Sequence, residues 1–220
     1  MILLRMPAAV VFDMDGLLFD TETLYQEAAL LAAAEGGHKA TGDIFFQLIG
    51  VPWARGRELL LGHFGDDFPV DDFVTVWVRH FEAIAATRLA LKPGVIELLD
   101  LLDTLRLPRA IATSSSHHTV VQHLDAGGLT GRFDAIVGAG DYAHGKPAPD
   151  PFLAAAARLG IAPAECLALE DSHNGVRSAA AAGMMTIMVP DLLPPTDEIR
   201  ALCAHVAAHL DEVRRLILAS

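Results

Sequence analysis

The sequence predicts an α/β fold, a doubly wound parallel sheet into which an all-α segment is inserted. After residue 92 the chain alternates short apolar runs with helical patterns, which is typical of parallel strands joined by right-handed crossovers. Between residues 18 and 88, by contrast, helical patterns follow one another with no strand signal. We therefore expect a core domain of residues 1–17 and 89–220 and a helical cap domain of residues 18–88.

The first strand is predicted from the apolar run that precedes Asp13. Helices are predicted next over 21–35, with Thr21 as the capping residue, and over 41–49, 54–64 and 70–87. Pro93 and Gly94 mark the return to the core. There the patterns predict helices over 95–105, 119–126, 149–159 and 174–182, and strands over 109–113, 135–138, 166–170 and 186–189, the last of the sheet.

Composition limits the partners of this protein. A hydrophobic fraction of 52% and a charged fraction of 20% are those of a globular protein. The formal net charge of -12 argues against nucleic acid and anionic membranes, which require a basic surface. The two cysteines form no paired pattern, and the longest apolar runs are too short to span a bilayer. We expect a cytoplasmic protein, and a monomer by default.

Polar side chains cluster where the predicted strands end. Because the carboxyl ends of parallel strands share one edge, these side chains are expected to meet there. Residues two apart on a strand face the same side, so two adjacent carboxylates at the end of the first strand would repel unless a hard cation such as Mg²⁺ lay between them. Each residue alone has an ordinary explanation as a turn former, a helix cap or a surface lysine. The set comprises Asp13, Asp15, Thr113, Ser114, Lys146, Glu170 and Asp171.

Four segments, FDMDGLLFDTE, IATSSS, GKPAPDPF and LEDSHNGV, resemble the four motifs of the haloacid dehalogenase superfamily. The resemblance is to its branch of small phosphatases and β-phosphoglucomutases, and it covers essentially the whole chain. It implies a Rossmann-like core, a helical cap between motifs one and two, a Mg²⁺ cofactor and a small phosphorylated metabolite as the substrate.

The resemblance also implies roles for the acidic pair and the lysine. Asp13 would be the nucleophile that forms an aspartyl phosphate. Asp15 would be the general acid and then the general base, and its backbone carbonyl would ligate the metal. Lys146 would pair with Asp13 and with the phosphoryl oxygens, stabilising charge in the transition state.

The remaining core roles are implied in the same way. Asp171 would be a metal ligand, with Glu170 assisting directly or through water. Thr113 would hydrogen-bond the phosphoryl group, helped by backbone N–H groups at Ser114 and Ser115, where a helix is expected to begin.

The resemblance indicates the type of reaction more closely than it indicates the substrate. Mutases of this branch carry a histidine on the first cap helix where this chain has Tyr25, so we expect a phosphatase, with β-phosphoglucomutase chemistry as the alternative. Tyr25, Trp53 and Arg55 are the cap residues expected to contact the substrate, although each also suits simple packing or solvation. A catalytically silent binder is disfavoured by the intact acidic motifs. Hinges near 18–20 and 88–92 would let the cap close.

Overall fold

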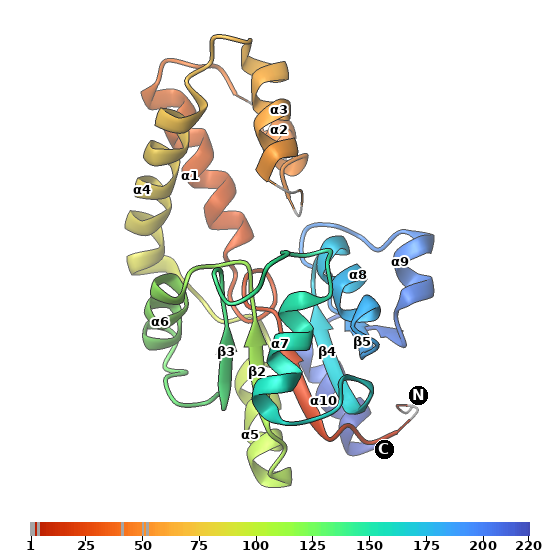
Figure 1. Cartoon of the computed structure of the whole chain (residues 1–220). Coiled ribbons are helices and arrows are strands. Elements are labelled where there is room, and N and C mark those ends of the chain that lie inside the picture. The colour runs from red at the N-terminus through yellow and green to blue at the C-terminus, as the bar shows by residue number, and fades with distance from the viewer. Residues whose placement is uncertain (1–2, 4, 41, 50, 52) are drawn as a thin grey trace. The chain divides into compact units, whose positions relative to one another are not determined.

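The computed structural model describes residues 3, 5–40, 42–49, 51 and 53–220. Two compact units are present (Figure 1): a core unit of Met1–Phe19 and Leu91–Ser220, and a cap unit of Asp20–Ala90. The boundaries predicted from the sequence lie two residues before each of these junctions. Among the described residues, no helix is long and apolar enough to cross a membrane.

The core unit is built on a six-stranded sheet in the order β3-β2-β1-β4-β5-β6. All neighbouring strands pair in parallel, which confirms the predicted doubly wound α/β fold. A strand of two residues, β6, was missed, because two residues are too short to show any periodicity. The strands are β1 (Ala9–Phe12), β2 (Arg109–Ala112), β3 (Ala135–Val137), β4 (Cys166–Glu170), β5 (Met185–Met188) and β6 (His205–Val206).

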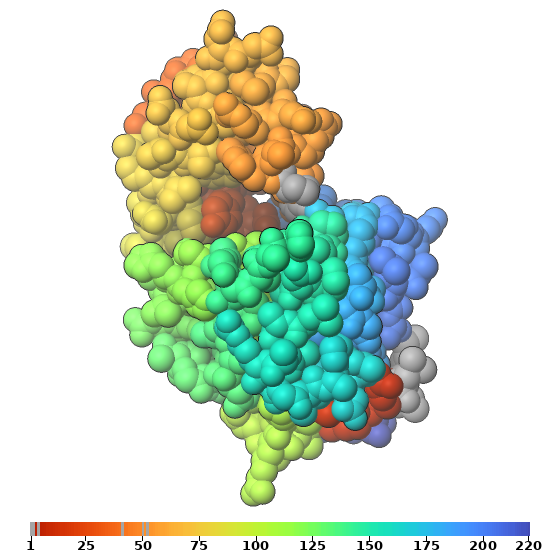
Figure 2. Space-filling view, in the orientation of Figure 1, coloured from red at the N-terminus to blue at the C-terminus, as the bar shows by residue number. Residues whose placement is uncertain are grey.

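Helices cover both faces of this sheet. Helices α7 and α8 lie over one face, and α5 and α10 pack against each other on the opposite face (Figure 1). Ala9, Ala110 and Ala168 of the strands pack against α7 and α8, which contribute alanines such as Ala155 to the same cluster. Because these side chains are small, the helices lie close to the sheet. In Figure 2 helix α7 and its flanking loops form the outer surface of the core unit on the visible side. The core helices are α5 (Val95–Leu105), α6 (His117–Ala126), α7 (Asp150–Leu159), α8 (His173–Ala181), α9 (Asp197–Leu202) and α10 (Leu210–Leu218), with a 3₁₀ turn at Pro163–Glu165.

The regular elements in the described part of the cap unit are helices. Alanines of α1, including Ala28 and Ala32, are buried and let α1 pack along α4. Thr21 precedes α1, but its side chain makes no cap hydrogen bond, since its backbone is already helical (φ -89°, ψ -30°). The helix predicted over 41–49 is shorter than expected, and residue 41 lies outside the described residues. The cap helices are α1 (Glu22–Glu35), α2 (Gly42–Phe46), α3 (Trp53–Phe64) and α4 (Val70–Arg88).

Candidate active site

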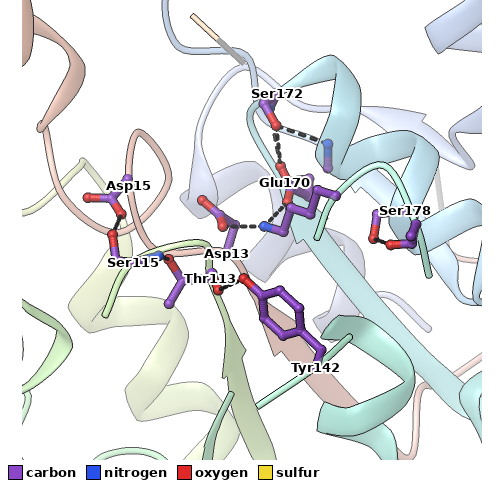
Figure 3. Close-up of polar contacts among 11 residues, drawn as sticks. Asp13, Asp15, Thr113, Ser115, Tyr142, Glu170, Ser172 and Ser178 are labelled. Carbon is purple, nitrogen blue, oxygen red and sulfur yellow. Dashed lines mark hydrogen bonds and ion pairs between the residues drawn. The ribbon is translucent and has the colours of Figure 1, made fainter. Parts of the chain in front are cut away.

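Three buried side chains from separate segments meet at the end of β1. Asp13 follows directly after β1, and its backbone N–H donates to the carbonyl of Leu169 in β4 at 3.0 Å, which extends the pairing of the strands. Lys146, from the loop between β3 and α7, donates its ammonium to Asp13 Oδ1 and, at 2.6 Å, to Oε1 of Glu170. All three side chains are less than a tenth exposed. Figure 3 shows the carboxylates of Asp13 and Glu170 close to each other at this edge of the sheet.

The donor set at this point fits a hard divalent cation. Asp13, Glu170 and Asp171 each offer a carboxylate oxygen within 4.8 Å of the others, and all three residues are buried. Three carboxylates against the one ammonium of Lys146 leave a formal charge of about -2 in a poorly solvated space. Oxygen ligands and this surplus of negative charge suit Mg²⁺. The side chain of Asp15 is not a member of this group, so only its backbone carbonyl remains as the metal ligand that the resemblance implies.

The pKa values of Asp13 and Lys146 also favour a cation at this site. Burial raises the pKa of Asp13 to about 8, with Glu170 and Asp15 adding to the rise and Lys146 opposing it. Burial would lower the pKa of Lys146, but the charges of Asp13 and Glu170 outweigh it and raise that pKa, so the lysine stays protonated. Additional positive charge beside Asp13, as a bound cation would supply, would lower its pKa and favour the ionised carboxylate.

Glu170 is held by residues that follow it. Its Oε2 accepts hydrogen bonds from the backbone N–H of Ser172 at 3.2 Å and from the Ser172 hydroxyl at 3.0 Å. The same hydroxyl oxygen caps α8 by accepting from the N–H of Gly175 at 3.1 Å. A Cβ atom at Gly175 would lie 1.9 Å from the Glu170 carboxyl carbon, so only glycine fits there. Sequence reasoning missed these two residues, although both belong to the LEDSHNGV segment.

Thr113 follows β2 at the same edge of the sheet. It is buried, and its hydroxyl oxygen accepts from the backbone N–H of Ser115 at 3.1 Å. Tyr142, not predicted from the sequence, donates its hydroxyl to the Thr113 carbonyl at 3.1 Å and so supports this turn. Ser114 is exposed. The expected helix start at Ser114 and Ser115 is wrong, because α6 begins at His117 after Ser116, whose hydroxyl oxygen accepts from Thr119 N at 3.2 Å.

Asp15 points away from Asp13, contrary to the expectation that the two carboxylates would face the same side. The alternation of a strand does not reach Asp15, because β1 ends at Phe12. Asp15 Oδ2 accepts a hydrogen bond from the Ser115 hydroxyl at 2.7 Å, and Figure 3 shows this contact on the opposite side of Asp13 from Glu170. The two side chains still interact through their charges, as the pKa of Asp13 records.

Two of the three predicted cap residues lie at one cavity. A cavity of about 300 Å³ within the cap unit is lined by Tyr25 and Trp53, together with Phe45, Trp77 and other apolar side chains. The ring of Tyr25 stacks on Phe81 at 3.7 Å between centroids. Arg55 is not among the residues that line this cavity, and its guanidinium pairs with Glu58 at 2.7 Å on the surface.

Comparison with known proteins agrees with this site. Residues 7–183 match the family model of the haloacid dehalogenase-like hydrolases. The chain belongs to this family. It is 36% identical to protein CbbY of Cupriavidus necator over 86% of this chain and 80% of that protein. It is 32% identical to a phosphorylated carbohydrates phosphatase of Thermotoga maritima, over 81% of this chain and 83% of the relative.

A solved structure shows the same fold over nearly all of the chain. CbbY from Rhodobacter sphaeroides, crystallised with phosphate, superimposes with a TM-score of 0.79 at 26% identity, covering 94% of this chain and 96% of the other. The prediction of a hydrolase in the phosphatase branch of the haloacid dehalogenase family is thereby confirmed.

Proposed function

We propose that the protein is a Mg²⁺-dependent phosphatase that hydrolyses a small phosphorylated metabolite through an aspartyl phosphate on Asp13. The observation that carries this proposal is the buried pairing of Lys146 with both Asp13 and Glu170 beside the carboxylate of Asp171. Burying charged groups costs stability, and buried charges of this kind are typical of sites where they take part in chemistry. The name of the Thermotoga maritima relative supports a sugar phosphate as the substrate class.

In this proposal each residue acts on one part of the reaction. Lys146 holds the Asp13 carboxylate in place and neutralises the phosphoryl oxygens as Asp13 attacks the phosphorus. The Thr113 hydroxyl and the N–H groups of the following turn bind the same oxygens. Asp15 protonates the leaving oxygen, and later removes a proton from the water that attacks the aspartyl phosphate. Asp13, Asp171 and Glu170 would hold Mg²⁺, which supplies positive charge to the transferring group when bound.

We propose that residues of the cap unit bind the part of the substrate beyond the phosphoryl group. Tyr25 and Trp53 line a cavity of about 300 Å³ with a largely apolar lining, a size that suits a small metabolite rather than a macromolecule. Arg55 keeps its proposed role for a distal carboxylate or phosphate, in competition with Glu58. The hinges near 18–20 and 88–92 remain the proposed points of cap closure. We also expect the protein to act as a monomer in the cytoplasm.

The test is phosphate release from a panel of sugar phosphates and nucleotides, with Mg²⁺ or with EDTA. Release that requires Mg²⁺ and is lost in Asp13→Asn supports the proposal. Conversion of β-glucose 1-phosphate to glucose 6-phosphate without net phosphate release would indicate the mutase alternative instead. Absence of both activities across the panel, with Mg²⁺ binding intact, would favour a silent binder.

A further inference from the structure

A buried histidine on α6 lies beside Asp15. His123 is 5% exposed, and its ring lies 5.6 Å from that of Phe19, centroid to centroid. A leucine would suit these apolar surroundings better, since burying an imidazole costs free energy unless a polar group faces it. The group that faces it is the carboxylate of Asp15, with Nδ1 of His123 3.9 Å from Oδ1.

Asp15 is thereby flanked on both of its oxygens by one stretch of chain. Ser115 donates to Oδ2 at 2.7 Å, and His123 lies next to Oδ1, which is buried and accepts no hydrogen bond from the described residues. Ser115 precedes α6, and His123 lies within that helix, at His117–Ala126. The helix holds the imidazole, and a hydrogen bond from the Ser115 N–H to the Thr113 hydroxyl oxygen holds the turn that carries the Ser115 hydroxyl, so the two groups frame the carboxyl group.

We propose that His123 is a positioning residue which, together with Ser115, sets the orientation of the Asp15 carboxyl group for proton transfer. The inference rests on the proposed function, in which Asp15 protonates the leaving oxygen. Proton transfer requires the donor within hydrogen-bonding distance of the oxygen that it protonates, so the direction in which Asp15 points controls the rate.

A pair of substrates separates this role from a general loss of structure. Cleavage of an alkyl phosphate, such as a sugar phosphate, depends on protonation of the leaving oxygen, whereas p-nitrophenyl phosphate releases a stable anion without it. The rate constant for phosphorylation of Asp13 is measured for both by rapid quench, and their ratio is the readout. The variants are His123→Leu, which keeps an apolar side chain beside Phe19, and His123→Asn, whose amide can take the place of Nδ1.

We expect His123→Leu to lower the alkyl phosphate rate constant about 10- to 100-fold, with a much smaller fall for p-nitrophenyl phosphate. His123→Asn should recover part of the ratio. Ser115→Ala, at a partly exposed side chain, tests the other half of the frame and should lower the same ratio even where His123→Leu folds poorly. Binding of beryllofluoride with Mg²⁺, which requires Asp13 and Lys146 but no proton donor, should persist in all three.

An equal fall in the rate constants for both substrates would overturn the role of His123 while leaving the proposed function in place. So would unchanged rate constants in variants that bind beryllofluoride normally. A wild-type protein with no Mg²⁺-dependent phosphatase activity would overturn the proposed function, and this inference with it.

Discussion

Replacing Lys146 with methionine is the sharpest test of the charge balance at the site. The ammonium lies between Asp13 and Glu170 and is itself less than a tenth exposed. Methionine has a similar length and no charge, so the change removes the cation and leaves the volume filled. Two carboxylates that shared one cation would then lie buried without it, next to Asp171.

Breaking a buried ion pair by removing one partner costs about 3–5 kcal/mol. For a domain of this length 1 kcal/mol corresponds to about 2–4 °C, so the melting temperature at pH 7.5 should fall by about 6–20 °C. Loss of Lys146 raises the pKa of Asp13 further, because the lysine opposes the effect of burial. Below about pH 8 Asp13 keeps its proton in both folded proteins, whereas above it only the variant keeps the proton, so the loss of stability should grow as the pH rises from 7.5 to 9.

The assay is thermal unfolding in EDTA at both pH values, with Lys146→Met/Glu170→Gln as the matched control. The double variant removes a carboxylate together with the cation and should be more stable than Lys146→Met alone. A fall of less than about 2 °C in the single variant, too small for a broken buried pair, would refute the reasoning. So would a double variant no more stable than the single one, because the destabilisation would then not come from unbalanced charge.

Two further perturbations test the surroundings of the site. In Gly16→Ala the new Cβ would lie 2.4 Å from Oδ2 of Asp171, so calorimetry should show weaker Mg²⁺ binding. The control is Gly128→Ala, also at positive φ (+67°) but with nothing within 4 Å, which should lower stability and leave Mg²⁺ affinity unchanged. Equal affinities in the two variants would contradict the steric argument. Hydrogen bonds from Arg158 and the Gly138 N–H hold the pKa of Asp141 well below its usual range. Asp141→Asn should therefore lower the melting temperature at pH 7, and this difference should vanish as the pH falls below about 4. A difference that does not depend on pH would show that the shape of the side chain, and not its charge, matters there.

The sequence predicted the sheet and the meeting of its strand ends because both depend on local patterns. The apolar strands β1, β2 and β4 are bounded by polar residues, and parallel topology then brings Asp13, Thr113 and Glu170 to one edge. The direction of Asp15 was not predictable from alternation, because β1 ends at Phe12 and the period of two does not extend to residues 13–15. The support that Tyr142 gives to Thr113 has no periodic signal, since it comes from a loop 29 residues away.

The two aspartates of the first motif differ in their surroundings. Only Met14 separates Asp13 from Asp15 in the sequence, yet the two side chains lie in different environments. Asp13 faces Lys146 and two further carboxylates, where the surplus negative charge favours a bound cation. Asp15 faces a hydroxyl and an imidazole, which orient a carboxyl group without pairing it to a lysine. Two carboxylates in different environments can take different roles, one as nucleophile and one as acid and base, as proposed for this pair.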